Sequence, residues 1–156
     1  MIGFDSIGTM GRLGNQMFQH AAVKGIARKH GYEYAIPPKD PSSQIDNYGL
    51  LDAFEMKGVD HIKYCYNVVP AQERFFHYDE ELMDICPDNV NVAGFFQSEK
   101  YFKHIDKFHF ILKDFNIIKN NDKFNVGVTQ FYNNYISYSN WSSKYQLKNI
   151  MNKSMI

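Results

Sequence analysis

The chain has 156 residues, a length that suits about one domain. Its 17 basic and 17 acidic residues leave no formal net charge, which argues against a partner bound by bulk electrostatics, such as nucleic acid. No apolar run approaches the roughly 20 residues that span a bilayer, and residues 1–31 lack the pattern of a signal peptide. We therefore expect a cytoplasmic protein that has no transmembrane segment and is at most peripheral to a membrane.

Cysteine and histidine are too sparse to suggest a metal centre. Cys65 and Cys86 stand far apart without a CxxC motif, and the six histidines are scattered along the chain. Both cysteines are predicted to be small buried hydrophobic residues. We expect neither a metal site nor a disulfide framework.

The first part of the chain has the order of an α/β unit. Residues 2–7 favour a short strand, and glycines then recur at Gly8, Gly11 and Gly14, which predicts a loop. Residues 15–30 follow with apolar and small side chains at helical spacing. A strand, a glycine-rich loop and a helix in this order indicate an α/β fold.

The ends of this helix also carry sequence signals. Asn15 is a suitable N-cap, and Gly31 is a suitable stop after three consecutive basic residues. A second strand is predicted over residues 32–36, where two prolines close it.

Further short elements are predicted downstream. Asp79 and its two acidic neighbours begin a short helix. Ser98 caps another helix, and a second helical stretch follows to Phe115. The further strands predicted by composition are residues 62–69, 72–78, 90–96 and 125–128.

The stretch GRLGNQMFQ, residues 11–19, is the best candidate for chemistry. Glycines let backbone N–H groups approach a ligand, and the following helix start favours an anion such as a pyrophosphate. Arg12 adds a permanent cation, while the amides of Asn15 and Gln16 suit sugar hydroxyls. The spacing matches neither GxGxxG nor a P-loop, so on spacing alone a structural turn and a ligand loop both remain open.

The order of residues in this stretch resembles the N-terminal signature of the α-1,2-fucosyltransferases, which move fucose from GDP-fucose to a galactoside. A second block, GFFQSEKYF at residues 94–102, is similar to that family's aromatic–Gln–Ser–Glu–Lys–Tyr–Phe segment. The two blocks occur in the expected order, and the resemblance covers residues 1–128. It implies a Rossmann-like N-terminal lobe of a two-lobed, GT-B-type glycosyltransferase that inverts the anomeric carbon and requires no metal.

The resemblance also implies a set of substrate-binding residues, without assigning a catalytic base. These residues are Gly11, Arg12, Gly14, Asn15, Gln16, Gln97, Ser98 and Glu99. The last three have an alternative interpretation, in which Ser98 caps a helix, Glu99 lies in its first turn and the following aromatic residues pack in the core. The implied partners are GDP-fucose as donor and a galactoside-containing glycan as acceptor.

One part of the family pattern is absent. The family carries a His-x-Arg-Arg-Gly-Asp motif that contacts the donor phosphates, but Thr129 stands where it should begin and no arginine follows Arg74. Residues 129–156 contain no acidic residue and no amphipathic pattern, which we interpret as a truncated or frame-shifted tail. We expect the isolated chain to transfer little or no fucose unless a second chain supplies the missing lobe.

Three other functions are alternatives to this one. A sugar- or nucleotide-binding remnant would bind without turnover. A phosphate-loop hydrolase is disfavoured, because no Lys-Ser/Thr pair follows the glycines. A protein O-fucosyltransferase has a similar glycine–Asn–Gln loop, but the block at residues 94–102 favours the glycan-directed family.

Overall fold

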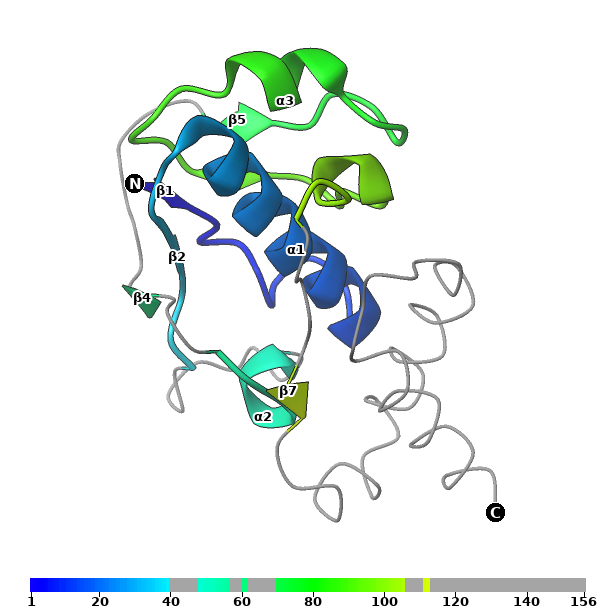
Figure 1. The fold of residues 1–156 in the computed structure, drawn as a ribbon. Coiled ribbons are helices and arrows are strands. Elements are labelled where there is room, and N and C mark those ends of the chain that lie inside the picture. The colour runs from blue at the N-terminus through cyan, green and yellow to red at the C-terminus, as the bar shows by residue number, and fades with distance from the viewer. Residues whose placement is uncertain (40–47, 57–59, 62–69, 106–110, 113–156) are drawn as a thin grey trace.

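The structure is a computed structural model that describes residues 1–39, 48–56, 60–61, 70–105 and 111–112. Its helices are α1 (Leu13–His30), α2 (Leu50–Ala53), α3 (Glu80–Ile85) and the 3-10 helix η1 (Glu99–Tyr101). Its strands are β1 (Ile2–Gly3), β2 (Tyr34–Ile36), β3 (Phe54–Glu55), β4 (Asp60–His61), β5 (Ala71–Gln72), β6 (Val92–Ala93) and β7 (Ile111–Leu112). Figure 1 shows α1 at the centre of these elements.

Five short strands run parallel beside α1. β2 pairs with β1 and with β4, and β6 pairs with β5. A parallel bridge between Gly3 and Asn91 joins β1 to the start of β6, and the Gly3 N–H donates to the Val90 carbonyl at 2.9 Å. The spatial order is therefore β4–β2–β1–β6–β5, with every carboxyl end at one edge. Ligands of α/β folds bind outside that edge.

α1 is buried over most of its surface and packs against β1, β2, α2 and η1. It ends at Gly31, whose φ of 73° is left-handed and whose N–H donates to the Ala27 carbonyl. Three basic residues in its last turn complement the helix dipole. The predicted stop at Gly31 is confirmed.

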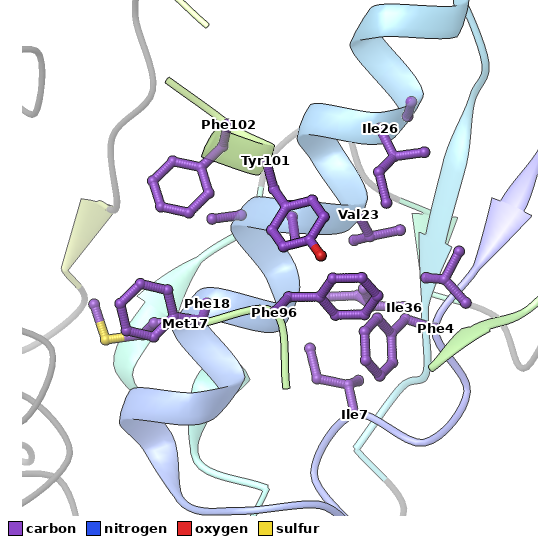
Figure 2. Packing of buried hydrophobic residues seen from close by; sticks show 14 of the residues in the cluster. Phe4, Ile7, Met17, Phe18, Val23, Ile26, Ile36, Phe96, Tyr101 and Phe102 are labelled. Atoms are coloured by element: carbon purple, nitrogen blue, oxygen red, sulfur yellow. The ribbon is translucent and has the colours of Figure 1, made fainter. Parts of the chain in front are cut away.

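An aromatic cluster fixes α1, β1 and η1 to one another. The ring of Phe96 packs edge-to-face against Phe4, at 5.7 Å between centroids, and against Tyr101, at 5.0 Å (Figure 2). The ring of Phe18, on α1, packs against Phe102 with 6.2 Å between centroids. Each of these rings is at most 1% exposed, so the cluster forms the centre of the core.

The strands are shorter than the sequence predicts. The structure has strands at residues 2–3, 34–36, 71–72 and 92–93, so the prediction of a strand over residues 72–78 is wrong beyond Gln72. The prediction that residues 90–96 form one strand fails because Gly94 and Phe96 have positive φ angles of 151° and 52°. An extended strand requires negative φ, so the chain turns there.

The two short helices, α3 and η1, are each capped by a side chain at their N-terminus. The Asp79 carboxylate accepts from the Leu82 N–H, and the Ser98 side chain accepts from the Lys100 N–H at 3.3 Å. The capping prediction for Ser98 is confirmed, whereas Asp79, which we expected in the first turn of its helix, is the N-cap that precedes it. The helix after Ser98 is only a single 3-10 turn.

Two helix predictions are wrong. α1 begins at Leu13, so Asn15 lies inside the first turn and is not the N-cap. The helical stretch to Phe115 fails at Ile111–Leu112, because these residues pair with β3 as an antiparallel strand.

The described residues thus combine helices with small parallel sheets, which is an α/β arrangement. Cys86 is buried, as predicted, with 2% exposure. Cys65, the strands predicted at residues 62–69 and 125–128, and the tail at residues 129–156 lie outside the described residues.

Candidate functional site

The glycine loop, residues 8–12, leads from β1 to α1. Gly8 and Gly11 have left-handed φ angles of 89° and 90°. A Cβ on Gly11 would lie 2.2 Å from Nδ2 of Asn15, so the loop passes directly against the first turn of the helix. Gly14, which we expected in the same loop, is instead a buried residue of α1. Its place in the loop is therefore corrected, and its contact with substrate stays a prediction.

Arg12 stands at the start of α1. It occupies the N-cap position without a side-chain capping bond, and its side chain is exposed. Within the part of the chain that the structure describes, Arg12 has no ion pair, so its guanidinium faces solvent beside the positive end of the helix dipole. An exposed cation at a helix N-terminus is suited to an anionic ligand.

Gln16 is a buried residue that holds the glycine loop in place. It is fully buried, and its Nε2 donates to the Gly11 carbonyl at 3.2 Å. Its Oε1 accepts from the N–H groups of Gly49 at 3.1 Å and Leu50 at 3.2 Å. Its amide therefore joins the glycine loop to the start of α2, and the predicted contact with sugar hydroxyls stays a prediction.

The second loop, residues 94–97, follows β6 at the same edge of the parallel strands. The Gln97 side chain is exposed, and its Nε2 donates to Oδ1 of Asn15 at 2.7 Å. These two residues are 82 positions apart in the sequence. The structure therefore brings together the two stretches that the sequence analysis singled out.

Ser98 and Glu99 lie at the start of η1. Ser98 caps η1, Glu99 lies in its first turn, and the following Tyr101 and Phe102 are buried. This arrangement matches the alternative interpretation of the block, in which Ser98 caps a helix and Glu99 lies in its first turn. Of the second block, Gln97 is the residue whose side chain bonds to the first turn of α1, at Asn15.

Sequence reasoning missed the buried groups beneath the two loops. Gln19 is fully buried, and its Nε2 donates to the carbonyls of Met10, at 3.0 Å, and Gly94, at 3.2 Å. A Cβ on Gly94 would lie 2.6 Å from Cβ of Glu73, so the second loop also rests on β5. The motif contains Gln19, but nothing in the sequence marks Glu73.

Glu73 is a buried carboxyl group with 9% exposure. Burial raises its pKa to about 7, although hydrogen bonds from the Tyr101 hydroxyl and from the backbone of Phe96 favour the charged form. Its Oε2 has no hydrogen-bond partner among the described residues. The group lies against the inner side of the second loop and not on its surface.

Asp79 and Arg74 form an ion pair beside Glu73. Nε and Nη2 of Arg74 donate to the two oxygens of the Asp79 carboxylate, at 2.9 and 2.6 Å. This pairing holds the pKa of the Asp79 carboxyl well below its usual range. The Asp79 N–H also donates to the Tyr101 hydroxyl at 2.8 Å, which ties the start of α3 to η1.

A pocket of about 340 Å³ lies between β5 and α3. Leu82, Ile85 and Val90 are among its lining residues, and none of the predicted site residues lines it. It is therefore separate from the two loops.

The described residues contain no group of three or more His, Cys, Asp or Glu that could hold a metal ion. No helix in the described ranges is long and apolar enough to cross a membrane. Comparisons with protein-family models, curated proteins and solved structures found no match for this chain.

Proposed function

We propose that this chain is a Rossmann-like lobe of a GT-B-type glycosyltransferase of the α-1,2-fucosyltransferase kind. Its substrates would be GDP-fucose and a galactoside-containing glycan. The observation that carries the proposal is the hydrogen bond between Asn15 and Gln97, which links the two resembling stretches at the carboxyl edge of the parallel strands. If residues 11–19 and 94–102 bind one ligand, they must form one surface, and this hydrogen bond brings them together.

The exposed groups at this surface suit a sugar nucleotide. The Arg12 guanidinium and the first turn of α1 offer positive charge and N–H donors to a pyrophosphate. The side-chain amides of Asn15 and Gln97 combine donors and acceptors, as sugar hydroxyls do. Beneath them, Gln16 joins the glycine loop to the start of α2.

In the proposed reaction, the 2-hydroxyl of the galactoside attacks the anomeric carbon of fucose. The bond to the β-phosphate of GDP breaks, and the configuration inverts. The role of this lobe is to position the substrates and to place positive charge near the leaving phosphate. Because the phosphate-binding arginine motif is absent from this sequence, we expect the isolated chain to bind substrates with little transfer.

Titration calorimetry of the purified chain with GDP-fucose, and separately with lactose, tests the proposal. Arg12→Ala should weaken GDP-fucose binding roughly tenfold, which is the effect of losing one charge-assisted hydrogen bond. Arg28→Ala is the matched control, because Arg28 is also an exposed arginine on α1 but lies in its last turn. Absence of saturable binding to either ligand, or an equal effect of both variants, would overturn the proposal.

A GDP-release assay with both substrates tests the expected lack of transfer. Little release above the rate without acceptor is the expected result. Robust, galactoside-dependent release would show that the chain needs no further arginines, and would refute that expectation while supporting the assigned reaction.

A further inference from the structure

One buried side chain touches both loops of the candidate site. Gln19 donates from a single nitrogen to the Met10 carbonyl in the glycine loop and to the Gly94 carbonyl in the second loop. Both neighbours are acceptors, so the nitrogen of the amide must face them. The two loops are therefore joined through one atom of α1.

The contribution of Gln19 to stability does not by itself explain an amide at this position. Its Oε1 is buried without a hydrogen-bond partner among the described residues. A buried acceptor left in this state opposes folding. Methionine would fill a similar volume with no such acceptor. In return, the amide nitrogen fixes the positions of the Met10 and Gly94 carbonyls.

The two loops need such support because their backbones lack regular hydrogen bonding. Gly11, Gly94 and Phe96 all have positive φ angles, at 90°, 151° and 52°. Neither a helix nor a strand can therefore continue through the loops. A relative shift of about 1 Å would be enough to disrupt the aligned groups of a binding site, including the 2.7 Å bond between Asn15 and Gln97.

We propose that Gln19 is a positioning residue, which holds the two loops in the arrangement where Asn15 meets Gln97 and Arg12 faces the ligand. Gln19 is fully buried and does not touch the ligand itself. The nature of the ligand rests on the proposed function. The proposed coupling of the two loops does not depend on the ligand, because it follows from the hydrogen bonds of Gln19.

Amide hydrogen exchange, followed by NMR on the full chain without ligand, tests the coupling. Gln19→Met should speed exchange by tenfold or more at the N–H groups of Thr9 and Ser98, which lie in or next to the two loops and donate to the carbonyls of Ser6 and Phe96. The interior of α1 should change little. Val23→Ala is the matched control, because Val23 is fully buried on the same helix and its side chain has no polar group. Unchanged exchange in the loops of Gln19→Met, or equal loosening by Val23→Ala, would overturn the proposal.

Gln19→Glu provides a second variant in case Gln19→Met does not fold. A protonated glutamic acid can donate to a carbonyl, whereas a carboxylate would face two carbonyl oxygens and repel them. After correction for intrinsic exchange, the loops of Gln19→Glu should be protected at low pH and should open as pH rises. Protection that does not depend on pH would contradict the role assigned to the donor nitrogen.

GDP-fucose affinity separates this proposal from the proposed function. Gln19→Met should bind GDP-fucose about tenfold more weakly than the wild-type chain. If the wild-type chain binds no GDP-fucose while the loops of Gln19→Met loosen, the proposed function fails and the positioning role stands. If both proteins bind equally and exchange equally, the positioning role fails.

Discussion

Gly25 of α1 lies directly against the backbone carbonyl of Tyr101 in η1. A Cβ at Gly25 would be 1.8 Å from the carbonyl oxygen of Tyr101 and 2.8 Å from its carbon. Nε2 of His104 donates to the Gly25 carbonyl at 2.9 Å, which holds the two segments together. Only glycine permits this approach. Gly25 thus determines how closely η1 sits on α1, and with it the position of the Tyr101 ring in the core.

Gly25→Ala should therefore destabilise the protein. Alanine favours a helix by about 1 kcal/mol, but overpacking a tight site costs about 1–3 kcal/mol or more. Here the obstacle is backbone, which cannot rotate away, so we expect a net loss of at least about 2 kcal/mol. Urea unfolding followed by circular dichroism measures this loss.

Gly31→Ala is the control for this prediction. No atom lies within 4 Å of a Cβ at Gly31, so the substitution costs only the strain of its φ angle of 73°, about 1 kcal/mol. Equal stability of Gly25→Ala and the wild-type protein would show that η1 can move away from α1.

Local signals in the sequence were sufficient to predict the ends of several helices. Asp79, Ser98 and Gly31 act through atoms within a few residues along the chain, so their roles follow from residue type and position. The order of strand, glycine loop and helix was predictable for the same reason. These features required no knowledge of the tertiary structure.

The contacts that build the candidate site could not be predicted in this way. Gln16 binds backbone 33 positions away, and Gln19 binds a carbonyl 75 positions away. Both were visible as polar residues beside the glycine loop, but their burial depends on where α2 and the second loop pack. The strand lengths could not be predicted either, because they depend on how each strand packs against its partner strands.

The ion pair between Asp79 and Arg74 predicts a loss of stability in acid. The Asp79 carboxylate is buried with 1% exposure and accepts from the Arg74 side chain as well as from the Leu82 N–H. Its pKa is depressed, so this stabilisation is present above the ordinary carboxyl pKa and is lost as pH falls below it.

Asp79→Ala should remove the ion pair and the cap of α3 together. We expect a loss of about 2–3 kcal/mol at neutral pH, because Arg74 is half exposed and the gain from its pairing is reduced by solvent. Urea unfolding at pH 7 and pH 3 measures the effect, which should be smaller at pH 3. The same loss at both values would contradict a role for the charge.

Glu73 should have the opposite pH dependence. Its pKa is raised to about 7 in the folded protein from an ordinary value of 4.5. The folded protein therefore binds an extra proton between these values, and its stability falls as pH rises from 4.5 to 7. The total change attributable to Glu73 is no more than about 3 kcal/mol.

Glu73→Gln should remove this dependence. The amide oxygen can still accept from the Phe96 backbone, and no charge has to be buried at high pH. We expect the variant to be more stable than the wild-type protein at pH 8 and similar to it at pH 5. Thermal unfolding across this range provides the comparison, and a parallel decline in both proteins would assign the dependence to another group.

Gln16→Met distinguishes a structural role of Gln16 from the ligand contact that the sequence suggested. The substitution leaves the Leu50 N–H and the Gly11 carbonyl without their partner, and Leu50 is fully buried. Each buried group left unpaired costs about 1–3 kcal/mol, so we expect a loss of about 3 kcal/mol in the free energy of unfolding. A ligand contact would instead reduce affinity for GDP-fucose or lactose with little change in stability.

Gln16→Glu refines the same test. Its carboxylate can still accept from Gly49 and Leu50, but it cannot donate to the Gly11 carbonyl. Its stability should lie between that of the wild-type protein and that of Gln16→Met. If Gln16→Glu is instead the less stable of the two variants, the cost of burying the new charge outweighs the retained bonds to Gly49 and Leu50.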